Sequence, residues 1–500
     1  MLNFITNEQM RKADEYTIKH LPIRSIDLME QACNSFVKRI TEDISVYEKI
    51  TVCCGTGNNG GDGLAIARLL RLKGYNNITV IILNIFSSSS PDFIVNKKRL
   101  NQLKIPLFEI KKANELPNNL DIVIDAVLGS GFQGNLKEPL AEIITKINYH
   151  AKYIFSVDCP SGLNIDSSKI KKYQGIKADK TISFQRPKLF FMFPESIVSS
   201  KSYEFVFIGL NEDFLQSLPS DYFWIEEKDI IGKLKVRQPF SHKGIYGHLL
   251  IIGGMSNTMG AAVLCAKSAL FTGVGLVTCC VPKENFSTLN ISQPEIMTLE
   301  RENFNEISLN KFNSVAIGSG LGLTQNSKEI VHKILNEKIP VVFDADALNI
   351  IAEENWLGKI PANSILTPHL KEFDRLFGSS EDWFARLEKA RCKAKELQCI
   401  IVLKNQYTFI CDTSGKVLIN SSGNPSMAQA GMGDVLTGCI ASFLSQGYTP
   451  LDAAILGCYI HGKSGNELNK VYEIAPASMV AIQISKILKN LTNQKNINLR

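Results

Sequence analysis

The chain has 500 residues, of which 45% are hydrophobic and 21% charged, so it is long enough for two or three globular domains and too apolar to be disordered. Its 55 basic and 49 acidic residues leave a formal net charge of +6. Because these charges are scattered and form no basic run, we expect no nucleic-acid partner.

The twelve cysteines include no C-x-x-C pair, and the adjacent pairs Cys53-Cys54 and Cys279-Cys280 lie in apolar, strand-like runs. This spacing favours buried free thiols over a disulfide framework or a zinc site, and therefore a reducing compartment. The first residues become charged too early for the apolar core of a signal peptide. We therefore expect a cytoplasmic protein.

In the first half of the chain, short β-branched runs alternate with helical patterns, which is typical of a parallel α/β sheet. A helix is predicted at 62–73, with Gly74 ending it. Strands are predicted at 49–54, 78–83, 121–127, 153–158, 180–184 and 203–208.

The regular alternation lapses at 211–230, a polar segment, and then resumes with different motifs. We therefore predict two unlike domains, 1–220 and 225–500. The second series has predicted strands at 248–252, 276–281, 314–317, 340–343, 364–366 and 399–403, and closing helices near 433–446, 451–468 and 476–489. Residues 259–281 are nearly all apolar, but glycines divide them, so we predict a buried helix–strand unit and no membrane span.

A glycine-rich loop, Gly-Thr-Gly-Asn-Asn-Gly-Gly-Asp-Gly, occupies 55–63 between a predicted strand and a predicted helix. Glycine lets a backbone approach a ligand closely, and the first N–H groups of a helix attract phosphate. A tight turn without a ligand would not need the side-chain oxygens of Asn58, Asn59 and Asp62. The loop matches neither a G-x-G-x-x-G fingerprint nor a Walker motif, so it predicts binding without naming a ligand.

Two further polar segments lie at predicted strand ends, one from Asp125 to Gly134 and one from Asp158 to Gly162. The ends of neighbouring parallel strands meet at the ligand crevice of such a sheet. There Asn59, Asp125 and Ser161 would offer only oxygen atoms, which suit a hard cation. Either aspartate taken alone could equally be a turn residue.

In this order, the three segments resemble the YjeF N-terminal family, the NAD(P)H-hydrate epimerases, over about residues 1–215. The resemblance implies a Rossmann-like, three-layer α/β/α sandwich, a K⁺ ion held by Asn59, Asp125 and Ser161, and a catalytic, proton-transferring Asp158. It implies a surface for the dinucleotide hydrate formed by Asn58, Asn59, Gly60, Gly61, Asp62, Gly129, Ser130, Gly131, Phe132, Gln133, Gly134, Asn135 and Asp158. Many relatives carry an aromatic residue where this chain has Pro139-Leu140.

The second half has its own glycine-rich segment, Gly431-Met432-Gly433-Asp434, at the start of an apolar predicted helix. The N–H groups there form an anion hole, and Asp434 in the first turn is placed to accept a proton from a substrate hydroxyl. Phosphoryl transfer needs these two features side by side. The alternative is an aspartate that only caps the helix.

Other polar segments follow predicted strands at 318–322, 344–349, 367–372 and 404–408. Lys404 in the last of them would reach nucleotide phosphates. His369 taken alone could be a buried, satisfied histidine. None of the seven histidines belongs to an H-E-x-x-H motif, so no zinc site is expected.

With Gly260-Ala261, these segments resemble the ribokinase-like family, and within it the NAD(P)H-hydrate dehydratases, over about residues 235–490. The resemblance implies a ribokinase-like α/β domain that uses Mg²⁺. It implies hydrate contacts from Gly260, Ala261, Gly320, His369 and the catalytic Asp434, and adenine-nucleotide contacts from Lys404, Asn405, Gln406, Tyr407, Thr408 and Gly433. Asn405 replaces the glycine usual in relatives, and Met432 replaces Thr or Ser, so a hydroxyl contact to phosphate is lost.

Together the resemblances predict a bifunctional repair enzyme. The first domain would interconvert the R and S epimers of hydrated NADH and NADPH. The second would dehydrate the S epimer with ADP as the co-substrate, or with ATP as the alternative. The rival interpretation is a ribokinase-like vitamin kinase fused to a non-catalytic dinucleotide-binding or dimerisation module. We expect small-molecule partners, no membrane, and a homo-oligomer.

Overall fold

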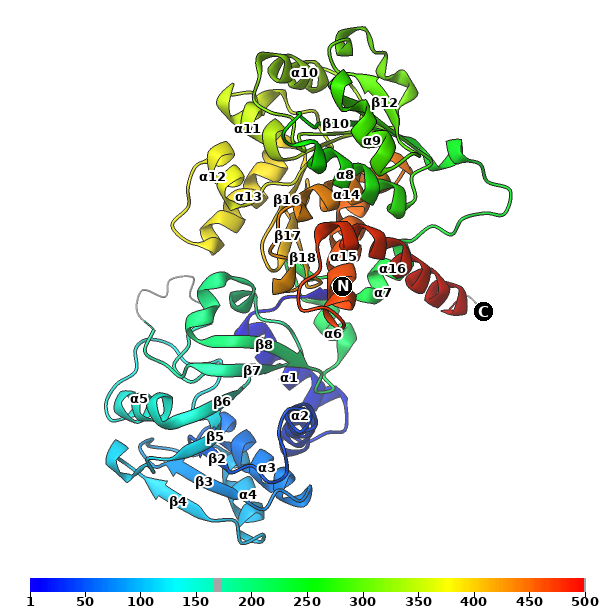
Figure 1. The fold of residues 1–500 in the computed structure, drawn as a ribbon. Coiled ribbons are helices and arrows are strands. Elements are labelled where there is room, and N and C mark those ends of the chain that lie inside the picture. Colours follow the sequence, from blue (N-terminus) through cyan, green and yellow to red (C-terminus); the bar gives the residue numbers. More distant parts are fainter. Residues whose placement is uncertain (166–172, 499–500) are drawn as a thin grey trace. The chain divides into compact units, whose positions relative to one another are not determined.

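The computed structural model describes residues 1–165 and 173–498. The chain forms two compact units, one comprising Leu2–Ser220 and the other Asp221–Arg500 with Met1. Both are α/β units built around largely parallel sheets (Figure 1). The α/β fold class expected from the alternating pattern is therefore confirmed.

The unit Leu2–Ser220 has a seven-stranded parallel sheet in the order β4-β3-β2-β5-β6-β7-β8. Its strands are β2 (Ile50–Cys54), β3 (Ile78–Leu83), β4 (Leu107–Ile110), β5 (Leu120–Ala126), β6 (Ala151–Val157), β7 (Ala178–Phe184) and β8 (Ser200–Val206), after a short β1 (Leu2–Asn3). Its α-helices are α1 (Asn7–His20), α2 (Ser25–Ile40), α3 (Asn58–Leu72), α4 (Pro91–Asn101), α5 (Leu140–His150) and α6 (Glu212–Ser217).

The sheet of this unit lies between two layers of helices, as the packing of β2 shows. Successive side chains of a strand point to opposite faces of the sheet. Val52 packs in one core with residues of α2 and α3, whereas its neighbour Cys53 packs in a second core with Ile143 and Ile144 of α5. All four side chains are fully buried. The expected three-layer sandwich is confirmed.

In the second unit the sheet runs β9-β18-β17-β16-β15-β14-β13-β10-β11-β12, and β17 is antiparallel to both neighbours. Its strands are β9 (Tyr222–Trp224), β10 (His248–Ile252), β11 (Leu276–Val281), β12 (Met297–Glu300), β13 (Ser314–Ile317), β14 (Val341–Phe343), β15 (Ile365–Leu366), β16 (Ile400–Leu403), β17 (Thr408–Cys411) and β18 (Val417–Asn420). Its α-helices are α7 (Glu227–Lys233), α8 (Met259–Thr272), α9 (Phe286–Ser292), α10 (Gln325–Leu335), α11 (Ala345–Glu353), α12 (Leu370–Phe377), α13 (Trp383–Leu397), α14 (Met432–Ser445), α15 (Pro450–Asn469) and α16 (Ala477–Asn498).

Helices α8, α14, α15 and α16 pack into one core against this sheet, while α10 to α13 lie on its other side (Figure 1). The apolar run 259–281 is the helix α8 followed by the strand β11, as predicted. Within the described part of the chain, no helix combines the length and apolarity that a membrane crossing requires. All twelve cysteines are free, and only Cys392 is exposed, which confirms the prediction of free thiols buried in the core.

The structure adds local detail that the sequence analysis lacked. The polar segment 211–230 forms α6, β9 and α7, in which Asn211 caps α6 and Leu215, Ile225 and Ile230 are buried. The hairpin of β17 and β18 was not among the predicted strands. Helix α3 begins at Asn58 rather than at residue 62, so much of the glycine-rich loop is helical.

Candidate active sites

The glycine-rich segment of the first unit is shaped by close backbone approaches. A Cβ atom added to Gly55 would lie 2.1 Å from the carbonyl oxygen of Val127, and one added to Gly60 would lie 1.9 Å from that of Gly55. A Cβ on Gly63 would meet Ala126 Cβ at 2.6 Å. Several of these glycines therefore serve the packing of α3 onto the sheet. The start of α3 has no side-chain cap, which leaves its first N–H groups available to a ligand.

The three predicted cation ligands converge at the ends of β2, β5 and β6. Ser161 Oγ donates to Asp125 Oδ1 over 2.5 Å and accepts from the N–H of Leu128 over 2.8 Å. Asn59 Nδ2 donates to the carbonyl oxygen of the same Leu128 over 2.9 Å. Asp125 and Ser161 are fully buried, and burial raises the pKa of the Asp125 carboxyl. The sequence prediction that these residues lie together agrees with this geometry.

Asp158, directly after β6, is held in an ion pair with a lysine that the sequence analysis did not select. Asp158 Oδ1 accepts from Lys188 Nζ over 2.8 Å and from the N–H of Phe184 over 3.2 Å. Both side chains are mostly buried, with 15% of Asp158 and 9% of Lys188 exposed. Asp158 has a φ of 61°, a left-handed conformation that is uncommon outside glycine and is often found at functional sites. Lys188 belongs to no recognisable motif, so only the structure could identify it.

The predicted substrate loop 129–135 is mostly exposed and lies beside α3. A Cβ on Gly129 would be 3.4 Å from Asn59 Cβ, and Gly134 has a φ of 89°. The carbonyl oxygen of Ser130 accepts from Asn7 Nδ2 over 2.7 Å. Asp62, on α3, has its pKa raised by burial and accepts a weak 3.5 Å contact from the Cys33 thiol. The loop, α3 and Asp62 therefore line one side of the same site.

In the second unit, Asp434 lies in the first turn of α14, after Gly431, whose φ is 87°. Burial raises the pKa of Asp434 to about 6, and the nearby Asp344 carboxylate adds to the shift. A carboxyl group with this pKa is still ionised at neutral pH, but it is a stronger base than an exposed aspartate. The structure therefore places this carboxyl group at a helix N-terminus, while its role as a base stays a prediction.

A buried charge network supports this helix. Lys404 Nζ donates to Asp344 Oδ1 over 2.9 Å, and Thr437 Oγ1 donates to Asp344 Oδ2 over 2.7 Å. A Cβ added to Gly433 would lie only 3.5 Å from Lys404 Nζ. Burial alone would lower the pKa of Lys404, but Asp344 and Glu372 raise it, so the ammonium stays charged at the first turn of α14. Asp344 and Thr437 were not predicted as site residues.

A cavity of about 360 Å³ opens beside Lys404 and Gly433, within the size range of small-ligand sites. Four of the predicted nucleotide contacts at 404–408 line it, whereas Tyr407 faces Trp224 with ring centroids 6.0 Å apart. Its apolar walls include Pro425, Met427, Ala428, Met432, Leu436 and Cys458. His461 also lines it: burial lowers the pKa of this histidine to about 4, and its Nε2 has no hydrogen-bond partner. No sequence motif marked this histidine.

The predicted hydrate contacts of this unit lie on neighbouring loops. The carbonyl oxygen of Gly320 accepts from Thr258 Oγ1 over 3.0 Å, which joins the Gly320 loop to the segment before Gly260 and Ala261 on α8. His369 caps α12 and forms a capping box with Glu372, and burial lowers its pKa. The capping contacts show that His369 has a structural role whether or not it also touches a ligand.

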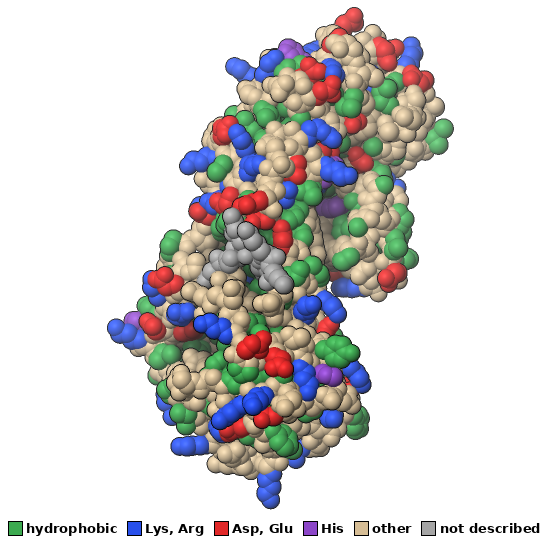
Figure 2. All heavy atoms as spheres, turned by 90° about the vertical axis from the view of Figure 1, so that its left-hand side faces the viewer, with side chains coloured by type: hydrophobic (Ala, Val, Ile, Leu, Met, Phe, Trp, Pro, Cys, Tyr) green, Lys and Arg blue, Asp and Glu red, His purple; other side chains and the backbone are tan. Residues whose placement is uncertain are grey.

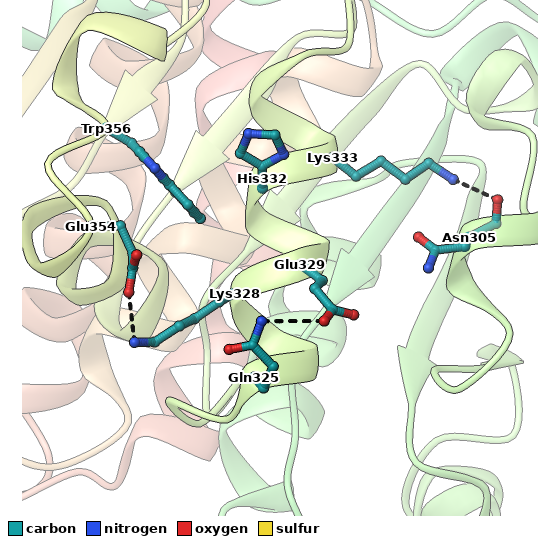
Figure 3. A pocket seen from close by; sticks show the side chains of 8 residues that line it. All are labelled: Asn305, Gln325, Lys328, Glu329, His332, Lys333, Glu354 and Trp356. Atoms are coloured by element: carbon teal, nitrogen blue, oxygen red, sulfur yellow. Dashed lines mark hydrogen bonds and ion pairs between the residues drawn. The ribbon is translucent and has the colours of Figure 1, made fainter.

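A second cavity of the same unit, of about 430 Å³, lies along α10 and is a weaker candidate (Figure 3). Its charged groups already have partners: Lys328 Nζ pairs with Glu354 over 2.6 Å, and Lys333 Nζ donates to the carbonyl oxygen of Asn305 over 3.0 Å. A ligand would have to displace these contacts. On the face drawn in Figure 2, basic and acidic side chains are interspersed in both units, as the scattered charges of the sequence predict.

Metal binding by clustered side chains receives little support. In the two described ranges, no group of three or more His, Cys, Asp or Glu residues is arranged to hold a metal ion. A cation in the first unit would therefore depend on the amide, hydroxyl and carbonyl oxygens near Leu128. A divalent ion in the second unit would need ligands from a bound phosphate.

Comparisons with known proteins identify a family for each half of the chain. Residues 25–190 match the family described as YjeF-related protein N-terminus, and residues 249–490 match the NAD(P)H-hydrate dehydratase family. The chain is 31% identical to a protein of Coxiella burnetii named bifunctional NAD(P)H-hydrate repair enzyme Nnr, covering 92% of this chain and 93% of that protein. It is 33% identical to a protein of that name from Moorella thermoacetica, over 93% and 92% of the two chains.

One similarity to a solved structure supports the fold of the second unit. A ribokinase-like superfamily protein from Enterococcus faecalis superposes with a TM-score of 0.52 and 24% identity, covering 55% of this chain and 98% of that one.

Proposed function

Because the chain belongs to the family of bifunctional NAD(P)H-hydrate repair enzymes, we propose that its two units divide the repair between them. Residues 1–220 interconvert the R and S epimers of hydrated NADH and NADPH. Residues 225–500 dehydrate the S epimer with an adenine nucleotide, ADP or ATP. The division is chemically useful if only one epimer fits the dehydratase, since spontaneous hydration gives both.

The observation that carries the dehydratase assignment is the position of Asp434 in the first turn of α14, directly after Gly433, which lines a ligand-sized cavity. Asp434 accepts the proton of the hydrate's hydroxyl as that oxygen attacks the terminal phosphate of the nucleotide. The N–H groups of the first turn of α14 and the ammonium of Lys404 stabilise the charge on the transferred phosphoryl group. Loss of phosphate and of a proton from the adjacent carbon then restores the ring double bond.

The residues that line the cavity beside Lys404 suit the chemical groups of an adenine nucleotide. The apolar walls suit a base, and Lys404 lies at the end that faces α14. Mg²⁺ is usually bound by one or two carboxylates together with substrate phosphates, so it would arrive with the nucleotide and lower the negative charge of its phosphates. Asp344, which is bonded to Lys404, and Asp434, in the first turn of α14, are the carboxylates that would be available to it.

In the first unit, the side-chain oxygens of Asn59, Asp125 and Ser161, together with the carbonyl oxygen of Leu128, would supply the ligands of a monovalent cation around one buried carboxylate. K⁺ there would order the strand ends and the substrate loop. The hydrate would lie along 129–135 and the first turn of α3, with its hydroxyl-bearing carbon toward Asp158 and Lys188. The cytoplasmic location and the homo-oligomer remain predictions from the sequence.

The test uses purified full-length protein with racemic NADH hydrate, supplied with ADP, with ATP, or with no nucleotide. Recovery of NADH from both epimers in the presence of a nucleotide is the expected result. A stable phosphorylated product without NADH would support a kinase and contradict the dehydratase. Recovery of only the S epimer, with the R epimer left at its spontaneous rate, would contradict the epimerase.

A further inference from the structure

Helix α1 borders the epimerase site, although the family match begins only at residue 25 and no motif of the sequence marks this helix. Asn7, Arg11 and Asp14 are spaced by four and three residues, so they share one face of the helix. Asn7 Nδ2 donates to the carbonyl oxygen of Ser130 over 2.7 Å. The guanidinium of Arg11 lies 3.2 Å from the position that a Cβ of Gly131 would occupy. This face therefore lies against the substrate loop.

Asp14 extends the same face toward the centre of the site. Its carboxyl group is within electrostatic reach of Asp158, Lys188 and Asp62, which come from three different segments of the unit. Asp158 is bound by Lys188 and by a backbone N–H, as described above. Asp14 by contrast forms no hydrogen bond or ion pair with any described residue. Two of the carboxyl groups at this site, Asp14 and Asp158, are thus in unlike surroundings, the arrangement that separates an acid from its partner carboxylate in many enzymes.

Burial and the charges around Asp14 together bring the pKa of this carboxyl group near neutrality. Burial, followed by the charge of Asp158, raises the pKa of Asp14 to about 7, while Lys188 opposes the shift. Glu15 on the same helix adds a small increase. Asp62 on α3 faces the same group, and burial raises its pKa as well. A carboxyl group that is partly protonated at pH 7 can both give and take a proton during one turnover.

We propose that Asp14 is the proton-transfer residue of the epimerase, and that Asp158, held by Lys188, positions the hydrate. The proposal rests on the proposed function of the first unit. The hydrated carbon bears a hydroxyl group beside the ring nitrogen. Asp14 gives its proton to that hydroxyl as the C–O bond breaks, the nitrogen lone pair forms a C=N bond, and water leaves. Water then adds to the opposite face and a proton returns to the carboxylate, with nothing oxidised or reduced.

The experiment compares full-length wild type with Asp14→Asn, Asp14→Glu and the control Glu15→Gln, which removes an exposed carboxylate from the adjacent position. Exchange between purified R and S hydrate is followed by chromatography without nucleotide, from pH 5.5 to 8.5, and the spontaneous rate is subtracted.

Because the protonated carboxyl group of Asp14 starts the reaction, the wild-type kcat should fall as the pH rises through about 7. Asp14→Asn should lower kcat by about 10²–10⁴ with KM within a few-fold. Asp14→Glu should regain part of the rate with a displaced pH profile. Glu15→Gln should keep the wild-type kcat, with its pH profile moved only slightly toward lower pH.

The proposal is overturned if Asp14→Asn keeps the wild-type kcat and pH profile, or if only KM rises. If Asp14→Asn loses its thermal unfolding transition, the pH profile of Asp14→Glu decides, and an unshifted profile counts against the proposal. Absence of epimer exchange in the wild type would instead contradict the proposed function of the unit, so the two failures are distinguishable.

Discussion

The two sites use aspartates in opposite ways. In the first unit, Asp158 is tied to Lys188 in a mostly buried ion pair, and a strained backbone fixes its position. In the second unit, Asp434 has no such lysine of its own, because Lys404 is bonded to Asp344 instead, and burial raises its pKa to about 6. From this contrast we infer that Asp158, held by its ion pair, positions a substrate, whereas Asp434, which has no such ion pair with a described residue, acts as a base.

The largest effect is expected from Asp434→Asn. The amide keeps the size of the side chain but cannot accept the hydroxyl proton, so NADH regeneration from the S hydrate should fall by about 10²–10⁴. Epimer exchange should be unchanged. The matched control is Asp452→Asn, which removes an aspartate from the first turn of α15 and breaks an ion pair with Lys233. A mutant that dehydrates within a few-fold of wild type would show that Asp434 is only a helix-terminal residue.

Some residues of the two sites could be predicted from the sequence, and others could not. Asp434 and Lys404 lie next to glycine-rich or strand-end segments, so local pattern was enough to select them. Asp344 was visible in its segment, but its role depends on bonds to Lys404 and Thr437, which are 60 and 93 residues away. Lys188 and Asp14 belong to no motif, and only the folded chain shows that they face Asp158.

The second prediction concerns Asp158→Asn. Asparagine tolerates the left-handed backbone, so the change mainly leaves Lys188 without its carboxylate. Removing one partner of a fully buried ion pair costs roughly 3–5 kcal/mol, and the partial exposure of Asp158 should reduce the loss of unfolding free energy to about 1–3 kcal/mol. Denaturant unfolding measures this loss, and epimer exchange should also fall. An unchanged midpoint would show that the ion pair does not stabilise the unit.

A third prediction uses the pH dependence of dehydration. The pKa of Asp434 is raised to about 6, and the base must be ionised, so activity is retained above that pH and lost as the pH falls through it. Between pH 6 and pH 5, the ionised fraction of a group with this pKa falls from about one half to about one eleventh, so kcat/KM from the S hydrate should fall by about fivefold. Other charged groups also face this carboxyl group, namely Asp344, Lys404 and Asp346. The assay is therefore repeated with Asp434→Asn, to show which group causes the loss of activity at low pH. A mutant with the same acid limb would assign the titration to another group.

The smallest effect is expected from Met432→Thr, which restores the hydroxyl usual at the start of α14. Met432 lines the nucleotide cavity and is nearly buried. A new hydrogen bond of about 0.5–1.5 kcal/mol would lower the KM for ADP by about two- to tenfold, with epimer exchange unaffected. Steady-state kinetics with saturating S hydrate measure the change. An unaltered KM would show that the phosphate does not reach this residue.

The most direct test of two independent sites in one chain is complementation. Purified R hydrate and ADP are given to wild type, to Asp434→Asn, to Asp158→Asn and to an equal mixture of the two variants. Wild type should recover NADH from the R epimer, and each variant alone should do so poorly. The mixture should regain most of the rate, because one variant supplies the epimerase and the other the dehydratase. A mixture as slow as the variants, with both proteins folded, would contradict the division of the reaction between the two units.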